Sequence, residues 1–501
     1  MGINRKQRLI YIIFIGVILF GANLIYNSWI NEGIRTLYLD DLGNYLSFKE
    51  KGNLEYIFNT DANKNRVLLN AIYVVIFNLI GQNFEILDNI LMILNWVIAI
   101  GISLIICSLC KNKEERIAQV LGLAGGVCYI ASRFSYYEIS EVFGIMENIA
   151  LIIAILILFL LINYINKQEN KYYYIASLLY FMILYVHERY IVLIGVFVIA
   201  SVLKNKKNIK EHKILILPLL ILIFFWGIRF LLFGNRVLDG TGGTDINETL
   251  NIYQVIEFSI SQIAYILGIN CGPEYLNGIL FTNVPLKINI LIGINIVVIL
   301  ITMTLFIKTL FEKKELVKKY LPIMLLIITF IGCCIISSSI TIRVEMRWIY
   351  VSYTAFLIME CMMISVVLME HKKTIWIFFL IFVQFISIQL YETYYRQNYK
   401  NIYYWQNRDL SYSLYDITIG SYGENFEDFQ TILVGMDSLQ WDEDGWKQFF
   451  SPYIEPDNLQ FIHINKIEEI INNKNALSDK TIVLTEDKKH REYVDISDLL
   501  K

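Results

Sequence analysis

Long, uninterrupted blocks of apolar residues dominate the chain, and short polar or charged segments separate them. A block of about 18 or more apolar residues is long enough to cross the hydrocarbon core of a bilayer as a helix. We predict about eleven membrane-spanning helices, which makes the chain an all-α polytopic membrane protein. The predicted spans begin at Leu9, Asp88, Ile117, Ile149, Tyr172, Ile191, Ile214, Ile288, Tyr320, Trp348 and Ile375.

The basic residues test this count, because loops rich in Lys and Arg stay on the cytoplasmic side of a membrane. With eleven spans, all six basic segments fall on one side. The arrangement predicts a multi-pass protein of the cell membrane with a cytoplasmic N-terminus and an extracytoplasmic C-terminus. The six segments are Arg5–Arg8, Lys111–Arg116, Lys167–Lys171, Lys204–Lys213, Lys308–Lys319 and Lys372–Lys373.

Some apolar stretches are too short for an ordinary span. Val67–Ile80 has only 14 residues, and counting it as a span would invert every segment that follows it. A short apolar helix is better explained as a re-entrant or interfacial segment, so we place it on the outer face. The two predicted spans on either side of His187 are also short, and we expect them to be tilted or buried within the bundle.

The chain divides into a membrane body, residues 1–395, and a polar tail, residues 396–501. The body has three long outer loops, residues 31–89, 132–148 and 235–287. The tail carries strand-like runs that alternate with helical patterns, which predicts a small extracytoplasmic α/β domain. The predicted strands are Thr431–Val434, Phe461–Ile464 and Thr481–Leu484.

Composition agrees with a lipid environment. Of the 501 residues, 56% are hydrophobic and 18% are charged, against about 25% charged residues in an ordinary soluble domain. The formal net charge of -3 does not indicate nucleic acid as a partner. The clustered lysines are explained by orientation in the membrane, so the bilayer itself is the expected partner.

An acidic pair, Asp40 and Asp41, follows the first predicted span closely. One of two adjacent carboxylates can take a proton from a hydroxyl group while the other holds a cation or a sugar hydroxyl. The neighbouring Tyr38, Leu39 and Leu42 would partly desolvate the pair and raise the pKa of a carboxylate. The alternative is a solvated turn, which uses the same residues.

A second acidic set, Glu138, Glu141 and Glu147, lies in the next outer loop. Glu138 and Glu141 are three residues apart, a spacing that would place them on one face of a helix. Both acidic sets would then face the same compartment. An ordinary solvated loop is the alternative explanation.

Arginines lie at two further outer turns, in the sequences HERY and RVEMRW. They are Arg189 in the first and Arg343 and Arg347 in the second. The planar guanidinium group can bind a phosphate with paired hydrogen bonds. The alternatives are snorkelling at the membrane surface and pairing with the neighbouring glutamates. Glu360 lies inside a predicted span, where an acid is either functional or paired with a polar neighbour.

The arrangement resembles the GT-C superfamily of polyprenyl-phosphate-dependent membrane glycosyltransferases. A first span is followed by an outer loop with the acidic pair Asp40–Asp41, which is within the family's range of DE, ED or D-x-D pairs. A short juxtamembrane helix that ends in NLIGQN and a span that begins with Asp88 come next. An acidic second outer loop, a polytopic body and an extracytoplasmic C-terminal domain complete the pattern.

Two charged turns add to this resemblance. They are ERY at Glu188–Tyr190 and R-x-E-x-R-W at Arg343–Trp348, which are similar to charged turns of bacterial members. The resemblance covers the chain up to about residue 395 and does not extend to the tail.

The resemblance implies an enzyme that moves a sugar from a polyprenyl-phosphate carrier to a glycan or glycolipid of the cell envelope, with inversion. Asp40 or Asp41 would be the base. The other aspartate, with Glu138 or Glu141, would orient the acceptor or a divalent cation; no other cofactor is expected. Arg189, Arg343 and Arg347 would bind the lipid phosphate, where negative charge develops.

Two alternative functions share the same compartment and substrate type. A transporter or flippase of lipid-linked saccharides would place its site near the middle of the membrane and would often show inverted repeats. The sequence shows no repeat, and its ionisable residues fall mainly in the predicted outer loops. A polymerase of lipid-linked repeat units is the other alternative, and the early acidic pair favours a glycosyltransferase over it.

Overall fold

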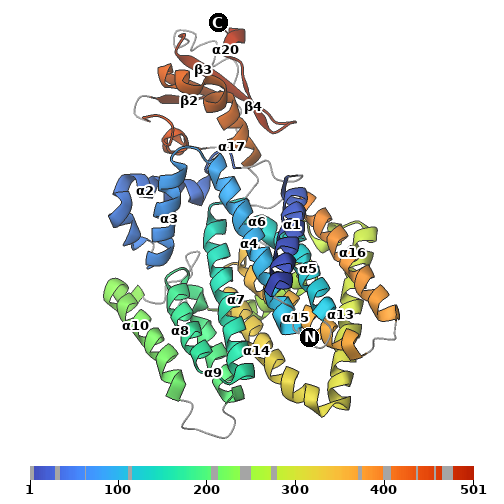
Figure 1. Ribbon diagram of the computed structural model, residues 1–501. Coiled ribbons are helices and arrows are strands. Elements are labelled where there is room, and N and C mark those ends of the chain that lie inside the picture. The colour runs from blue at the N-terminus through green and yellow to red at the C-terminus, as the bar shows by residue number, and fades with distance from the viewer. Residues whose placement is uncertain are drawn as a thin grey trace. The chain divides into compact units, whose positions relative to one another are not determined.

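The apolar blocks of the sequence form long helices in the computed structural model of the protein (Figure 1). The described part of the chain divides into two units by its contacts. Unit 1 comprises residues 1–32, 57–72 and 89–401, and unit 2 comprises residues 33–56, 73–88 and 402–501. The structure describes residues 5–28, 34–61, 64–110, 115–204, 213–236, 250–271, 279–370, 375–398, 408–435, 438–439, 441–455, 459–464 and 478–500.

Within these ranges, eight helices are long and apolar enough to cross a membrane, which supports the membrane class predicted from the sequence. They are α1 (Arg5–Ser28), α4 (Glu85–Cys110), α7 (Phe143–Lys167), α10 (Ile216–Phe233), α13 (Leu286–Glu312), α14 (Lys314–Ser339), α15 (Met346–Glu370) and α16 (Ile375–Gln397).

The predicted count of eleven spans is not confirmed. The three other predicted spans correspond to shorter helices: α5 (Glu115–Ala131), α8 (Lys171–Leu184) and α9 (Ile194–Lys204), with 17, 14 and 11 residues. A 3₁₀ helix, η2 (Glu188–Leu193), lies between α8 and α9. It interrupts the apolar run and leaves each flanking helix short of the about 20 residues that a full span needs.

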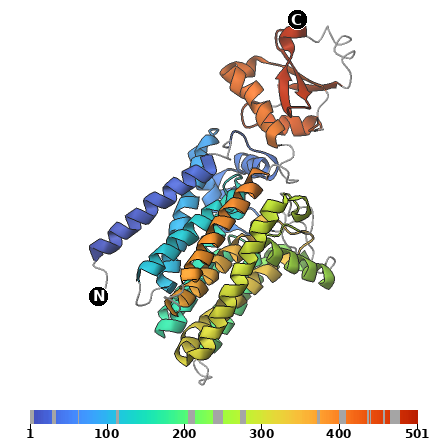
Figure 2. The same ribbon diagram turned by 90° about the vertical axis from the view of Figure 1, so that its right-hand side faces the viewer.

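Helix α15 is the core of unit 1. Of its span-length window, 94% is buried, whereas only 22% of the window at Lys213–Phe233 is buried. Helix α15 packs against α5, α7, α13 and α14, and also against the short helix α6 (Arg133–Glu138). Helix α10 packs beside α8 and α9 at the edge of the bundle (Figures 1 and 2). The charged residues of α15 are therefore surrounded by protein, while the apolar side chains of α10 are left for lipid.

Unit 2 contains a four-stranded sheet in the order β2-β1-β3-β4. Strand β1 is parallel to β2 and β3, and β3 is antiparallel to β4. The three predicted strands are confirmed, and β4 was not predicted. The strands are β1 (Thr431–Gly435), β2 (Gln460–Ile464), β3 (Thr481–Asp487) and β4 (Glu492–Asp495).

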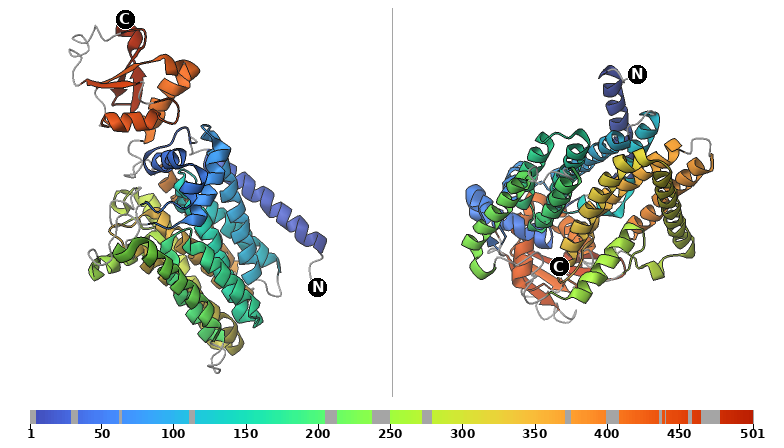
Figure 3. Two further views of the ribbon diagram at one scale, coloured as in Figure 1. Left: turned by 90° about the vertical axis from the view of Figure 1, so that its left-hand side faces the viewer. Right: turned by 90° about the horizontal axis from the view of Figure 1, so that it is seen from below.

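The helices and strands of the C-terminal part of the chain lie together (Figure 3), and one face of the sheet carries the apolar core of the domain. Trp446, Phe449 and Phe450 of helix α18 (Glu443–Phe450) pack with Phe461 and Leu484 of the strands. A smaller cluster of Leu433, Ile464 and Val483 is made by the side chains that alternate to the other face. The C-terminal part of the chain is thus a small α/β fold.

The same unit includes residues from the first predicted outer loop. The hydroxyl groups of Thr36 and Tyr453 form a hydrogen bond of 2.8 Å, and the side chain of Gln82 donates to the carbonyl of Pro452 at 2.7 Å. The rings of Phe84 and Tyr453 meet edge to face. Residues far apart in the sequence therefore fold together here.

Helices α2 (Leu39–Ile57) and α3 (Val67–Ile80) occupy the segment between α1 and α4. Tyr45 and Phe48 of α2 pack against Phe77 of α3. The 14-residue helix predicted at Val67–Ile80 is confirmed, and its position in the membrane stays a prediction. The domain boundary near residue 395 also stays a prediction. The membrane orientation stays a prediction as well, since Lys372–Lys373 and much of Lys111–Arg116 and Lys204–Lys213 lie outside the described residues.

Candidate functional site

The short helix α6 positions Glu138 at the start of the candidate site. All six residues of α6 are buried, Ser132 caps its first turn, and the helix ends at Glu138. A Cβ atom at Gly144 would lie 1.7 Å from the carbonyl oxygen of Glu138, so only glycine allows the chain to approach this closely. Asn148 donates to the same carbonyl at 3.3 Å. The backbone of Glu138 is therefore held directly against α7.

Helix α7 contributes a second acid to this place. Glu147 is fully buried and forms an ion pair with Nη2 of Arg189, which η2 carries. The same Nη2 lies 3.1 Å from the hydroxyl group of Tyr190, and Ser337 of α14 donates to the carbonyl of Arg189 at 2.6 Å. The pair thus joins α7, η2 and α14.

A third carboxylate, Glu345, lies between two arginines. It accepts from Nε of Arg343 at 2.7 Å and lies 2.5 Å from Nε of Arg347. Glu345 and Arg347 are buried, whereas the side chain of Arg343 is 24% exposed. The structure therefore shows these arginines paired with a neighbouring glutamate, which was one of the alternatives that the sequence left open.

These groups form one electrostatic cluster, which we call the carboxylate–arginine cluster. Glu138 interacts with Glu147, Arg347 and Arg189. All members belong to unit 1 and come from α6, α7, η2 and the start of α15. The members are Glu138, Glu147, Arg189, Glu345 and Arg347.

The cluster leaves hydrogen-bonding capacity unused. Within the part of the chain that the structure describes, neither carboxylate oxygen of Glu138 has a hydrogen-bond partner, and the same holds for Oε1 of Glu147 and Nη1 of Arg189. Buried polar groups are normally paired, so an unpaired one requires an explanation such as a ligand. A polar ligand could therefore form hydrogen bonds with the Nη1 donor of Arg189 and with the carboxylate oxygens of Glu138 and Glu147.

Burial raises the pKa of Glu138 well above the ordinary value of 4.5, and the neighbouring charge of Glu147 adds to the effect. Arg347 and Arg189 act in the opposite direction but do not cancel it. Burial and the neighbouring charge of Glu147 therefore both favour the uncharged form of Glu138. A raised pKa with a specific charge partner is a frequent property of functional sites.

A second buried ion pair flanks the cluster. Arg66 donates to both oxygens of Glu188, at 2.9 and 2.8 Å. Burial raises the pKa of Glu188, but the charge of Arg66 outweighs burial and holds that pKa well below its usual range. Burial lowers the pKa of His187, which stays neutral while its Nδ1 accepts from the backbone N–H of Arg189. These contacts fix the turn that presents Arg189.

The predicted site residues separate into two groups. Glu138, Arg189 and Arg347 come together in unit 1. Glu141 is half-buried in the turn between α6 and α7. The prediction that Glu138 and Glu141 share one helix face is wrong, because α6 ends at Glu138.

Asp40 and Asp41 belong to unit 2, in the first turn of α2. Asp40 is exposed and Asp41 is half-buried. The backbone carbonyl of Asp40 accepts from the side chain of Asn44 at 2.9 Å. Desolvation of Asp40 by its neighbours, which the sequence suggested, is not found. Carboxylates in the first turn of a helix are stabilised by the helix dipole, which explains their position locally.

Sequence reasoning missed the buried pair Arg133–Glu392. The backbone N–H of Arg133 donates to Oε2 of Glu392 at 2.9 Å, and the two side chains form an ion pair. Glu360, inside α15, hydrogen-bonds Gln384 of α16. The signal in the sequence was the presence of these charges in apolar segments, but the pairing of α6, α15 and α16 requires the fold. Arg133 lies in the second predicted outer loop, whereas Glu360 and Glu392 lie within the long helices α15 and α16.

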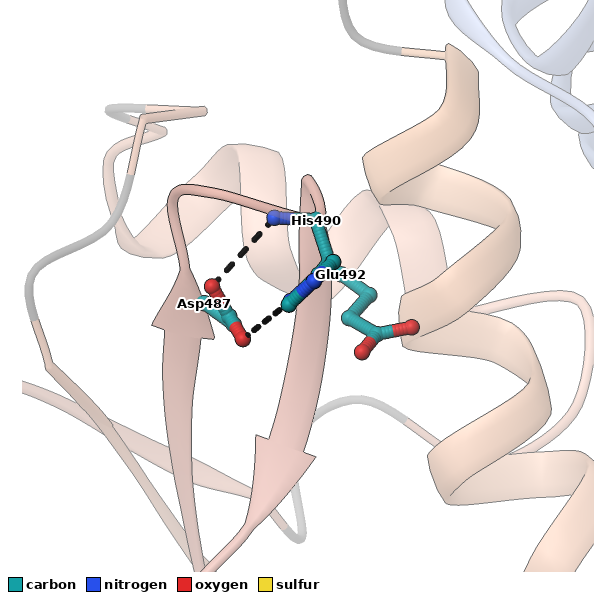
Figure 4. Close-up of side chains that lie close together, drawn as sticks. All are labelled: Asp487, His490 and Glu492. Atoms are coloured by element: carbon teal, nitrogen blue, oxygen red, sulfur yellow. Dashed lines mark hydrogen bonds and ion pairs between the residues drawn. The ribbon is translucent and has the colours of Figure 1, made fainter.

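A possible metal-ligand group lies at the turn between β3 and β4. Asp487, His490 and Glu492 bring their ligand atoms within 4.8 Å of one another (Figure 4). Asp487 already accepts from the backbone N–H of Lys489 at 2.9 Å and from Nδ1 of His490 at 2.7 Å. The pKa of Asp487 is lowered and that of His490 raised by this hydrogen bond. The neighbouring basic residues are Lys488, Lys489 and Arg491. We assign these contacts to stabilisation of the turn, because the basic neighbours oppose a cation.

Comparison with known proteins does not change this picture. A scan of family models found no match to the chain, and a search of curated proteins found none either. The functional argument therefore depends on the site.

Proposed function

We propose that the protein is a membrane glycosyltransferase that takes a sugar from a polyprenyl-phosphate carrier and moves it to a glycan or glycolipid of the cell envelope. The observation that supports this most is the carboxylate–arginine cluster. It is enclosed by apolar helices, yet among the described residues Nη1 of Arg189 and the carboxyl group of Glu138 have no hydrogen-bond partner. A lipid phosphate supplies both an anionic head group for the cluster and an apolar tail for the membrane.

In the proposed reaction, the acceptor hydroxyl attacks the anomeric carbon of the sugar. The bond from that carbon to the phosphate oxygen breaks, and the phosphate leaves with the electron pair. A general base takes the hydroxyl proton, and the candidates from the sequence are Asp40, which is exposed, and Asp41. Arg189, Arg343 and Arg347 hold the departing phosphate, where charge-assisted hydrogen bonds are strongest.

Sugar transfer by the purified protein in lipid nanodiscs tests this proposal. The donor is a synthetic polyprenyl-phosphate sugar, and the variants are Asp40→Asn, Asp41→Asn and the double variant. We expect at least one single variant to lose about 10²-fold in turnover, in the range of general-base contributions. Glu50→Gln is the matched control, because Glu50 is an exposed acid of the same helix α2. Full activity of the double variant would remove the aspartates from the reaction.

A specific observation also favours the second candidate, a transporter or flippase of lipid-linked saccharides. Glu138 and Glu147 are fully buried in unit 1, and Glu360 lies within α15. Ionisable residues inside a membrane bundle often mark transport or proton pathways. A polymerase of lipid-linked units remains the third candidate and would also consume a lipid-linked donor.

Proteoliposomes distinguish the two leading candidates. A fluorescent lipid-linked saccharide on one leaflet reports movement across the membrane, and product analysis reports a new glycosidic bond. The glycosyltransferase forms the bond without moving the intact donor. Movement of the intact donor that persists in the Asp40→Asn, Asp41→Asn double variant would establish the transporter instead.

A further inference from the structure

We propose that Glu138 takes part in the candidate site as an uncharged carboxylic acid whose O–H donates a hydrogen bond to a phosphate group, beside the unpaired nitrogen of Arg189. The inference assigns Glu138 a role different from orienting the acceptor or a cation. It rests on the proposed function only in taking the phosphate of a lipid as the ligand.

The geometry around Glu138 supports a fixed donor. Its backbone is held by the close approach of Gly144 and by the side chain of Asn148. Tyr350 in turn donates to Oδ1 of Asn148 at 2.7 Å, so α15 supports the same contact. The side chain begins from a buried, fully packed helix and has no hydrogen-bond partner among the described residues.

The surroundings of Glu138 decide its protonation. The charge of Glu147 acts on it most strongly, and Glu147 is already paired with Arg189. Two buried carboxylates that interact strongly do not both ionise, and the unpaired one keeps its proton. The charged and titratable groups that act on Glu138 come from α5, α7, α15, η2 and the turn before α7. They are Tyr129, Glu141, Glu147, Arg189, Arg347 and Tyr350, and Tyr137 of α6 itself is a further one.

This protonation state changes what the site can bind. An ionised Glu138 would repel a phosphate, whereas its acid form offers an O–H to a phosphate oxygen. Nη1 of Arg189 offers a second donor without an acceptor among the described residues. Together they supply one neutral and one charged hydrogen bond, which suits an oxyanion.

Binding of farnesyl phosphate to the full-length protein in nanodiscs, measured by calorimetry at about pH 7.5, tests the inference. Glu138→Gln keeps a donor and cannot ionise, while Glu138→Leu keeps the volume and has no donor. We expect Gln to bind within about threefold of wild type and Leu to bind about tenfold or more weakly, as a lost hydrogen bond to a charged group requires. The melting temperature of each variant shows whether it is folded.

Two results would overturn the inference. Binding that is more than tenfold tighter in Glu138→Gln means that Glu138 is charged and repels the ligand. Equal binding by wild type and Glu138→Leu means that no donor is lost. The double variant Arg189→Gln, Glu147→Gln removes the charge of the second donor without leaving an unpaired charge, and we expect it to bind farnesyl phosphate more weakly as well.

Two further ligands identify the source of the phosphate. Binding of farnesyl phosphate without binding of inorganic phosphate supports a lipid head group, and equal binding of both overturns the lipid source. Farnesol that binds as tightly as farnesyl phosphate overturns the phosphate site. These binding outcomes are separate from catalysis. If sugar transfer is absent but binding is intact, only the proposed enzymatic activity is contradicted. If Glu138→Gln and Glu138→Leu bind farnesyl phosphate equally well, only the role of Glu138 is contradicted.

Discussion

Asp40 and Glu138 are both acids that the sequence places shortly after a predicted membrane span, but their surroundings differ completely. Asp40 is exposed in the first turn of α2, where the helix dipole favours a carboxylate. Glu138 is fully buried at the end of α6 and has no hydrogen-bond partner among the described residues. The difference shows that an acidic motif does not by itself tell how deeply its members are buried.

The two acids also differ in how much structure holds them. Asp40 uses local contacts, such as the hydrogen bond from Asn44. Glu138 depends on a close approach of two chain segments and on the charges of α7, η2 and α15. Substitutions around Glu138 should therefore have large effects, and substitutions of Asp40 should affect stability little.

The largest effect is expected for Gly144→Ala. Its Cβ would lie 1.7 Å from the carbonyl oxygen of Glu138, so the backbone of α6 or α7 has to move. We expect a loss of about 4 kcal/mol or more, or no folded protein, because overpacking against backbone has no cheap relief. Thermal unfolding in detergent measures it. The control is Gly293→Ala, whose Cβ meets nothing within 4 Å. A wild-type melting temperature for Gly144→Ala would contradict the close approach.

Arg189→Gln should follow in size. It leaves the fully buried Glu147 without its ion-pair partner, which typically costs about 3–5 kcal/mol. Adding Glu147→Gln removes the unpaired charge and should recover most of the loss. Lys308→Gln, which breaks the exposed pair with Glu312, should change unfolding by less than about 1 kcal/mol. Equal losses for the single and double variants would show that the pair is not the cause.

Glu138→Gln should make the protein more stable, and only above acidic pH. Because burial raises the pKa of Glu138 in the folded protein, the folded state holds its proton more tightly than the unfolded state. The wild type therefore loses stability as pH rises from the ordinary value of about 4.5 towards the folded pKa, whereas the Gln variant does not. Melting temperatures should agree near pH 4 and diverge by about pH 8. Parallel curves would mean that Glu138 is ionised in the folded state.

The smallest effect is expected for the stability of Asp40→Asn. The variant loses only a favourable interaction with the helix dipole at an exposed position, worth about 0.3–1 kcal/mol. The melting temperature should fall slightly, while sugar transfer is affected much more if Asp40 is the base. A large loss of stability would show that Asp40 has a structural role that its exposure does not suggest.

The sequence by itself was sufficient for features that depend on short stretches of chain. Apolar length predicted the eight long helices, and alternation in the tail predicted β1, β2 and β3. The sequence also gave an acidic pair and three arginines as candidates, although it could not tell their environments. The predicted spans on either side of His187 are short, as the sequence indicated, and the 3₁₀ helix η2 takes up the start of the second one.

Only the tertiary structure decided which charged residues meet. Glu345 forms ion pairs with Arg343 and Arg347, which are close to it in the sequence. Arg189, by contrast, pairs with Glu147, 42 positions away, and Arg133 pairs with Glu392, 259 positions away. Such pairs depend on the packing of helices, for which the sequence has no local signal. The raised pKa of Glu138 depends on the fold in the same way, because desolvation and the charge of Glu147 act only once α6, α7 and η2 enclose it.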